Sequence, residues 1–329
     1  MFTPLVIGII GIAYTFDFFN GFHDSANSIS TVVSTRALSP LAAVGMAATF
    51  NFVAFLIFGF AVASTIGSGI ISPLSINEYV ILAALIGAIT WDIVTWYFGL
   101  PTSSSHALIG GLIGAGVTEG GLGVLVWGSL SKTLTFLALS PLFGFVLAFF
   151  VMTAMLNAFR RFSNHVVNGY FRRLQLISSS LVSLSHGSND AQKTMGVVTA
   201  LLVTTGYLSK FSVPFWVAIM ANSAIALGTL FGGWRIVRTM GFKVTKLDPV
   251  HGFAAETTAA GVIMTSSLLG IPVSTTHVVT GSIMGVGATR RFTAVRWGVA
   301  RRIVWAWLIT IPMSALVACL AYLAISLFV

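Results

Sequence analysis

The sequence has very few charged residues. Only 8% of its 329 residues are Asp, Glu, Lys or Arg, and 56% are hydrophobic, whereas about a quarter of the residues of a soluble domain are charged. This composition excludes a soluble globular domain and predicts a protein that crosses a membrane several times. Cysteine is nearly absent as well, and the single Cys319 excludes a disulfide within the chain.

Acidic residues are scarcer than basic ones. The chain has 8 acidic and 17 basic residues and a formal net charge of +9. We attribute this charge to membrane topology rather than to a nucleic-acid partner, because most of the basic residues cluster around 160–173, 235–246 and 290–302. Cytoplasmic loops are enriched in Lys and Arg. The clusters are therefore predicted to face the cytoplasm. Both termini are predicted to lie on the outer side of the cell's cytoplasmic (inner) membrane.

Two polar motifs each occur twice, in the same order. Residues 21–28 (GFHDSANS) recur as 187–194 (GSNDAQKT), and residues 99–106 (GLPTSSSH) recur as 270–277 (GIPVSTTH). The second copies follow the first by 166 and 171 positions. Two unrelated motifs at nearly one spacing indicate a duplicated half, and interrupted polar segments at matching places in two halves are typical of a transporter's binding site.

The basic loops suggest that the halves are inverted. When the basic loops of the second half are shifted back by about 171 positions, they fall on loops of the first half without a basic cluster. We therefore predict an all-α polytopic membrane protein built from two inverted-topology repeats. The first repeat spans 1–156, a cytoplasmic connecting loop spans 157–173, and the second repeat spans 174–329.

The apolar segments predict about 10–12 membrane segments, at about 20 residues for a full span. Six are long enough to cross: 41–66, 79–98, 133–156, 213–234, 252–270 and 303–328. The segments that hold the first motif, 4–35 and 175–205, are expected to be helices broken at the motif. Shorter stretches follow Pro101 and Pro272, at 104–117 and 275–288. Each forms either a second span or the return arm of a re-entrant hairpin.

Several carboxylates fall in apolar segments, where burial costs about 2.5–3.5 kcal/mol even on the lenient insertion scale. Asp24 and Asp190 occupy the same place in the two repeats, with Asn27 and Asn189 close by. Carboxylate and amide oxygens are hard ligands, so these four residues are candidates for a Na⁺ site, and His23 is a candidate proton carrier. The other acids in apolar segments are Asp17, Asp92 and Glu256. Asp17 and Asp92 have no acidic counterpart and are as consistent with a paired or protonated group as with a functional one.

The second motif predicts an anion site. Ser103, Ser104 and Ser105 in one half, and Ser274, Thr275 and Thr276 in the other, open short helices. Free N–H groups at a helix start bind anions, although capping alone would explain one hydroxyl residue. Gln192 and Lys193 in the first motif are further substrate-binding candidates. His106 and His277 are expected to bond to backbone across the hairpin, and Asn51 and Asn222 are expected to support the site from behind.

These motifs resemble the PiT family of inorganic phosphate transporters, whose signature is a Gly-x-Asn-Asp-x-x-Asn-type segment in each half. Residues 21–28 and 187–190 carry the resemblance, and the stretch on to Pro40 is similar to the bacterial branch of low-affinity phosphate permeases. The resemblance implies symport of phosphate with a proton or sodium, inverted repeats and often a homodimer. It also implies that Asp24, Asn27, Asn189, Asp190, Glu256 and both hydroxyl runs lie at the transport site.

Two departures bear on the coupling ion. His23 replaces the asparagine of the sodium-coupled pattern, and Asn51 stands where sodium-coupled eukaryotic relatives carry glutamate. Both changes resemble bacterial relatives that use protons and carry metal-phosphate complexes.

The favoured interpretation is a symporter that imports phosphate into the cell across a lipid membrane. A sulfate permease of the same fold and an anion channel are the alternatives. A P-loop, an HExxH motif and a cysteine-rich metal pattern are all missing from the sequence, so we expect neither an enzyme nor a cofactor.

Overall fold

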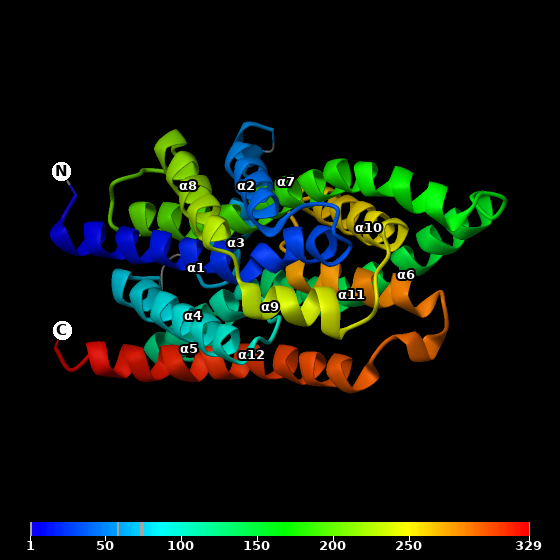
Figure 1. Cartoon of the computed structure of the whole chain (residues 1–329). Helices are drawn as coiled ribbons and strands as arrows, with labels where there is room; N and C mark the ends of the chain where they lie inside the picture. The colour runs from blue at the N-terminus through cyan, green and yellow to red at the C-terminus, as the bar shows by residue number, and fades with distance from the viewer. Residues whose placement is uncertain (1, 58, 73–75, 329) are drawn as a thin grey trace.

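The computed structural model describes residues 2–57, 59–72 and 76–328. The described residues form an all-helical molecule (Figure 1), as predicted. Its α-helices are α1 (Pro4–Ser34), α2 (Pro40–Val53), α3 (Ala61–Gly69), α4 (Glu78–Phe98), α5 (Ser104–Gly120), α6 (Trp127–Ala158), α7 (Asn164–Thr204), α8 (Phe215–Phe231), α9 (Trp234–Arg238), α10 (Pro249–Leu268), α11 (Thr275–Ala288) and α12 (Trp297–Ile325). Short 3₁₀ or π turns lie at η1 (Ala54–Leu56), η2 (Leu122–Val124), η3 (Thr239–Lys243) and η4 (Phe292–Ala294).

The second motif forms the same turn in each half. Gly99 and Gly270 come just after the ends of α4 and α10. Their φ angles are 65° and 67°, a conformation that glycine adopts without steric penalty. The next helix begins a few residues later, and the side chains of Ser103 and Ser274 accept hydrogen bonds from the N–H groups of His106 and His277. The motif therefore folds as a glycine turn followed by a serine cap.

The first motif does not break its helices. α1 and α7 run without interruption through residues 21–28 and 187–194, so the prediction of broken helices at these places is wrong. The glycines instead permit close packing. A Cβ on Gly21 would collide with the Ile225 carbonyl oxygen of α8, and one on Gly187 would lie 2.6 Å from the Asn51 carbonyl oxygen of α2. No proline interrupts either motif, so the backbone keeps its helical hydrogen bonds.

The breaks lie in the neighbouring helices. The segment from α2 to α3 bends by 81°, and the segment from α8 to η3 bends by 59°. The predicted span 41–66 is consequently two helices rather than one. Gly232 (φ 68°) stands at the second bend, where a left-handed residue ends α8.

The central connection is shorter than predicted. α6 ends at Ala158 and α7 begins at Asn164, so most of the polar stretch 157–173 forms the first turns of α7. Ser163 takes the extended N-cap conformation, and the polar residues that follow it form regular helix.

The arrangement in space is that of two inverted halves (Figure 1). Both termini lie at one end of the molecule, and the α6–α7 connection lies at the other. The α4–α5 hairpin occupies the end with the termini, and the α10–α11 hairpin occupies the opposite end. At 1.5 Å per residue α5 and α11 are only about 25 and 20 Å long, shorter than the ~30 Å hydrocarbon core. These lengths favour re-entrant hairpins over pairs of spans.

Length and hydropathy alone identify fewer spans than predicted. Four described helices, α1, α4, α6 and α12, are long and apolar enough to cross a membrane, and the two bent pairs bring the number to six. α7 fails this test although it has 41 residues, because it carries many of the buried polar residues of the molecule. The total of 10–12 membrane segments remains a prediction.

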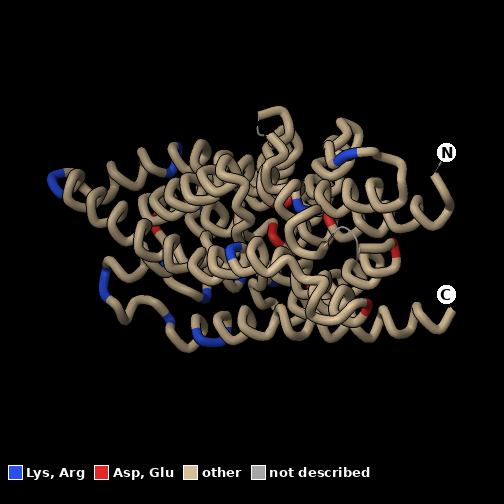
Figure 2. Tube along the Cα trace, turned by 180° about the vertical axis from the view of Figure 1, so that it is seen from behind, with Lys and Arg blue, Asp and Glu red and all other residues tan. Residues whose placement is uncertain are grey.

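Charge is distributed unevenly along the molecule. Figure 2 shows most of the Lys and Arg residues toward the end opposite the termini, which is the separation expected from the basic clusters. Acidic residues appear in the interior, and they lead to the candidate site.

Candidate functional site

The site is built along an antiparallel seam between α1 and α7. Near the end of α1, Thr35 Oγ1 donates to Gln175 Oε1 at 2.7 Å. Farther back on α1, the Ser28 carbonyl accepts from Ser179 Oγ at 2.7 Å. As residue numbers fall along α1, the numbers of its partners on α7 rise, so the two helices run antiparallel. This direction brings the first motif of one repeat against the first motif of the other.

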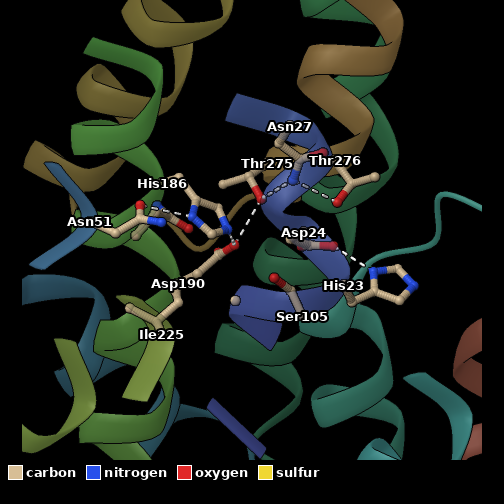
Figure 3. Close-up of polar contacts among 12 residues, drawn as sticks. His23, Asp24, Asn27, Asn51, Ser105, His186, Asp190, Ile225, Thr275 and Thr276 are labelled. Atoms are coloured by element: carbon tan, nitrogen blue, oxygen red, sulfur yellow. Dashed lines mark hydrogen bonds and ion pairs between the residues drawn. The ribbon is translucent and has the colours of Figure 1, made fainter. Parts of the chain in front are cut away.

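The two motif carboxylates meet at the centre of this seam. Asp24, Asp190 and His186 each offer a ligand atom within 4.8 Å of the other two, and all three side chains are buried. His186 Nε2 lies 3.1 Å from Asp190 Oδ2, and His23 Nδ1 lies 2.7 Å from Asp24 Oδ1 (Figure 3). Carboxylate oxygens and imidazole nitrogens at this spacing can hold a metal cation or a proton.

Lys193 links the centre to both copies of the second motif. Its ammonium pairs with the Asp190 carboxylate and donates to Ser105 Oγ at 2.5 Å and to the Val273 carbonyl at 3.1 Å. Only 1% of the lysine is exposed, so its charge depends on these partners. One cation of α7 therefore contacts the hydroxyl turns of both repeats.

Thr275 and Thr276 complete the connection to α11. Thr275 Oγ1 donates to Asp190 Oδ2 at 2.8 Å. Asn27 Nδ2 donates to Thr276 Oγ1 at 3.0 Å and reaches Thr275 Oγ1 at 3.3 Å (Figure 3). The start of α11 is thereby fixed against both α1 and α7.

The helix starts of α5 and α11 face each other. His106 and His277 have ring centroids 4.5 Å apart, and the His277 ring also lies 4.0 Å from the Trp307 ring of α12. Two helix N-termini with hydroxyl side chains therefore converge on one buried region, which is the arrangement predicted for an anion. Hydrogen bonds from both histidines to backbone across the hairpin were expected. The rings instead lie against each other, and the backbone partner of His277 is Leu137 of α6.

The individual hydroxyl residues have different tasks. Ser103 and Ser274 are occupied as caps, whereas Ser105, Thr275 and Thr276 bond to side chains of the first motif. Ser104 Oγ is buried and makes no hydrogen bond of good geometry with the described residues, and the Asp92 carboxylate lies beside it. A buried hydroxyl without a well-formed protein hydrogen bond is a natural contact for a bound anion or water.

His23 joins the first repeat's two motifs. Its Nε2 lies 3.2 Å from Thr95 Oγ1 of α4 and 3.3 Å from Thr102 Oγ1 of the second motif. Asp92, also on α4, is a close charged neighbour of both His23 and Asp24. Its two carboxylate oxygens make no hydrogen bond of good geometry in the described part of the chain, and the Ser104 hydroxyl lies beside them.

Two predicted site residues hold other helices. Gln192 Oε1 accepts from Val62 N at 3.0 Å and from Ala63 N, so it caps α3 rather than facing the anion region. Asn189 Nδ2 donates to Ser267 Oγ of α10 at 3.0 Å. Its Oδ1 is buried and unpartnered within the described residues and is still able to act as a ligand.

Glu256 lies apart from the centre. Gln175 Nε2 donates to Glu256 Oε1 at 2.9 Å, and Ser178 Oγ donates to its other oxygen. Ser178 precedes Asp190 by 12 positions on α7, which corresponds to about 18 Å. Thr31, which also lies beside the Glu256 carboxyl group, follows Asp24 by seven positions on α1, which corresponds to about 10 Å. The structure does not bring Glu256 together with Asp24 and Asp190.

The two supporting asparagines behave differently. Asn51 Oδ1 lies 3.1 Å from His186 Nδ1, and Asn51 Nδ2 donates to Thr229 Oγ1 at 2.9 Å, so Asn51 orients an imidazole of the site. Its repeat partner Asn222 donates to the Ala218 carbonyl of its own helix and reaches no site residue.

His186 is not among the residues predicted from the sequence. A signal is present, since His186 stands four residues before Asp190 and residues at this spacing share a helix face. Its repeat partner is Asn20 rather than a histidine, so the duplication of the two halves does not point to it.

Comparison with known proteins identifies the family of this chain. The Phosphate transporter family matches residues 20–168 and 157–318. A "Probable low-affinity inorganic phosphate transporter" of Rhizobium meliloti (strain 1021) is 57% identical over 98% of this chain and 97% of its own length. A protein of the same description from Bacillus subtilis (strain 168) is 43% identical over 98% of each chain.

A solved structure has the same fold. It is described as "The sodium-dependent phosphate transporter" and superposes with a TM-score of 0.89. The two sequences are 26% identical, and the superposition covers 99% of this chain and 100% of the other. With the family match over both halves and relatives of this similarity along nearly the full length, the chain belongs to the phosphate transporter family.

Proposed function

We propose that this protein is a secondary symporter that imports inorganic phosphate together with a proton or a sodium ion. One observation carries the proposal: the hydroxyl-bearing starts of α5 and α11 and the carboxylates of Asp24 and Asp190 belong to a single buried cluster. Helix N-termini, hydroxyls and Lys193 suit an oxyanion. Adjacent carboxylates suit a cation.

The charges in the cluster explain why an anion needs a companion. Asp24, Asp92 and Asp190 contribute three acids, whereas Lys193 is the only Lys or Arg among the described residues of the cluster. A phosphate added to this set would meet net negative charge at short range, and such repulsion is strong away from water. A proton or cation on the carboxylates removes the repulsion. Binding of the cation and of phosphate is therefore expected to be mutually favourable.

In this proposal the residues divide into two groups. Ser104, Ser105, Thr275, Thr276 and Lys193 contact phosphate. Asp24, Asp190, His186 and the amide oxygens of Asn27 and Asn189 hold the cation or proton, with His23 bonded to Asp24. A divalent metal that travels with phosphate would use the Asp24, His186 and Asp190 atoms.

Phosphate is favoured over sulfate because of the carboxylates. Phosphate near neutral pH carries an O–H donor and sulfate carries none. An acceptor such as the Asp24 or Asp190 carboxylate beside the anion therefore discriminates in favour of phosphate. An anion channel is disfavoured, because His23, Asp24, Asp190 and Lys193 are each no more than 2% exposed.

The basic end of the molecule is assigned to the cytoplasm and the termini to the outside. An inward gradient of the coupling ion across the cell's cytoplasmic membrane then drives phosphate into the cell, and a homodimer in that membrane is the expected assembly.

Uptake of labelled phosphate into proteoliposomes tests the function. An imposed pH gradient and an imposed sodium gradient are applied separately, with sulfate as competitor. Accumulation of phosphate with either gradient, unaffected by excess sulfate, is the expected result. Accumulation with neither gradient, or entry of labelled sulfate instead, contradicts the proposal.

A further inference from the structure

Asp17 is a buried carboxylate outside the cluster described above. It lies in the interior of α1 and is 0% exposed. Neither of its oxygens makes a hydrogen bond of good geometry with the described residues. A carboxylate in this condition is costly when ionised, so Asp17 needs either a bound cation or a proton.

The polar neighbours of Asp17 are few. Thr194 of α7 and Asn20 of α1 lie beside its carboxylate. Thr194 Oγ1 and Asn20 Oδ1 are themselves buried without a partner in the described part of the chain. These groups can bond to a carboxyl group that gains or loses a proton.

The charged groups near Asp17 come from two helices. Asp190 and Lys193 face it from α7, and the Tyr14 hydroxyl faces it from α1. The helices α2 and α8, which pack on α1, contain no titratable residue.

Several charged or titratable groups on the other helices that approach α1 lie beside residues other than Asp17. Asp92 of α4 lies beside His23, Glu256 of α10 is held by Gln175 and Ser178, and Arg235 of α9 lies over the Trp96 and Tyr97 rings. The histidines of α5 and α11 lie against each other.

These surroundings suit a proton better than a sodium ion. Sodium, like other hard cations, takes several oxygen ligands, and only the Thr194 and Asn20 side chains are hydrogen-bonding neighbours of the Asp17 carboxylate among the described residues. A proton needs only one carboxylate oxygen and converts the buried charge into a neutral group. The hard-ligand set lies instead at Asp24 and Asp190.

Asp17 is also connected to the central cluster. Asp17, Asn20 and Asp24 are spaced by three and four residues, so they share one face of α1, and Asp17 is two turns, about 10 Å, from Asp24. Asp190 is a charged neighbour of Asp17, and its carboxylate has an oxygen within 4.8 Å of an oxygen of Asp24. Protonation of Asp17 therefore changes the charge that the phosphate region experiences.

We infer that Asp17 is a proton-carrying residue of the transport cycle: its carboxylate takes up a proton with phosphate binding and releases it on the other side of the membrane. This inference rests on the proposed function. The phosphate itself is held by the second motif and does not contact Asp17, so exchange of phosphate for phosphate does not require Asp17 to titrate. Net accumulation driven by a pH gradient does require it.

The test compares wild type with Asp17→Asn in proteoliposomes free of sodium. Two rates are measured: accumulation of labelled phosphate under a pH gradient, and exchange of labelled for unlabelled phosphate at equal concentrations without a gradient. Asp17→Asn is expected to lose at least about tenfold in accumulation and to keep exchange within about threefold. Accumulation at the wild-type rate, or equal loss of both rates, overturns the inference.

Three further variants keep the test decisive. Asp17→Glu retains a titratable group and is expected to retain accumulation, whereas Asp17→Ser, which copies the repeat partner Ser183, is expected to behave like Asp17→Asn. Glu119→Gln removes an exposed acid at the end of α5 and is expected to change neither rate. Should Asp17→Asn fail to insert, Asp17→Ser carries the same comparison.

Failure of the inference is distinguishable from failure of the proposed function. If wild type moves no phosphate under any gradient, the proposed function fails. If wild type accumulates phosphate and Asp17→Asn does so equally, only the role of Asp17 fails. Accumulation that responds to a sodium gradient alone, and that Asp17→Asn abolishes, contradicts a proton at Asp17 and assigns it to sodium.

Discussion

The imidazole rings of His106 and His277 lie with their centroids 4.5 Å apart and their planes inclined by 38°. The two residues occupy the same place in the two repeats, 171 positions apart in the chain. Each lies in the first turn of the short helix that follows the glycine turn, so this contact holds the two helix starts against each other. An anion between these starts would be bound by both halves of the protein at once.

Loss of either central carboxylate is expected to stop transport. Asp24→Asn and Asp190→Asn each remove a negative charge that the coupling ion requires, and uptake should fall by at least about tenfold. Asp190→Asn should also reduce thermal stability, because it leaves the Lys193 ammonium buried without its acid, a change that typically costs about 3–5 kcal/mol. Uptake per inserted protein and melting temperature in detergent are the measurements.

The two variants separate transport from folding. Asp24→Asn leaves a neutral amide next to His23 and should melt closer to wild type than Asp190→Asn. Near-normal uptake in both would remove the cation site from this account.

Ser104→Ala is expected to weaken phosphate binding more than it destabilises the protein. The Ser104 hydroxyl makes no hydrogen bond of good geometry in the described structure, and the Asp92 carboxylate lies beside it, so stability should change by less than about 1 kcal/mol. A hydrogen bond to a charged ligand contributes about 1.5–3 kcal/mol, so the apparent KM for phosphate should rise about tenfold or more. An unchanged KM would show that Ser104 does not bind phosphate and serves only the structure of the helix start.

Gly21→Ala should prevent correct packing of α1 against α8. The added Cβ would meet the backbone of Ile225, and backbone cannot move aside cheaply. Gly11→Ala on the same helix is the matched control, since a Cβ there meets nothing within 4 Å and alanine favours helix by roughly 0.5–1 kcal/mol. Thermal unfolding of both variants is the comparison, and similar melting temperatures would argue against a continuous, closely packed α1.

Gln192→Ala is expected to act on stability rather than on phosphate affinity. Its side-chain oxygen accepts from two N–H groups at the start of α3, and loss of such a cap costs about 0.5–2 kcal/mol. The KM for phosphate should remain unchanged while the melting temperature falls. A raised KM at unchanged stability would restore Gln192 to the anion site.

The sequence predicted the parts of the site that depend on repetition. Asp24 and Asp190, and the serine and threonine runs, were found because each has a partner in the other half. Residues without a partner were placed less well. His186 has Asn20 as its counterpart and was missed, and Glu256 was assigned to the centre although its partners Ser178 and Thr31 lie about 18 Å from Asp190 along α7 and about 10 Å from Asp24 along α1. The helix geometry at the first motif was also wrong, because glycine in a membrane helix serves close packing as well as interruption.

Binding of phosphate as a function of the coupling ion tests the central claim most directly. Titration calorimetry on the purified protein, at several pH values and with or without sodium, gives the phosphate Kd under each condition. The account predicts that one of the two cations tightens phosphate binding at least about tenfold, with the reciprocal effect of phosphate on that cation. A phosphate Kd that is independent of both pH and sodium, beyond the ionisation of phosphate itself, would contradict it.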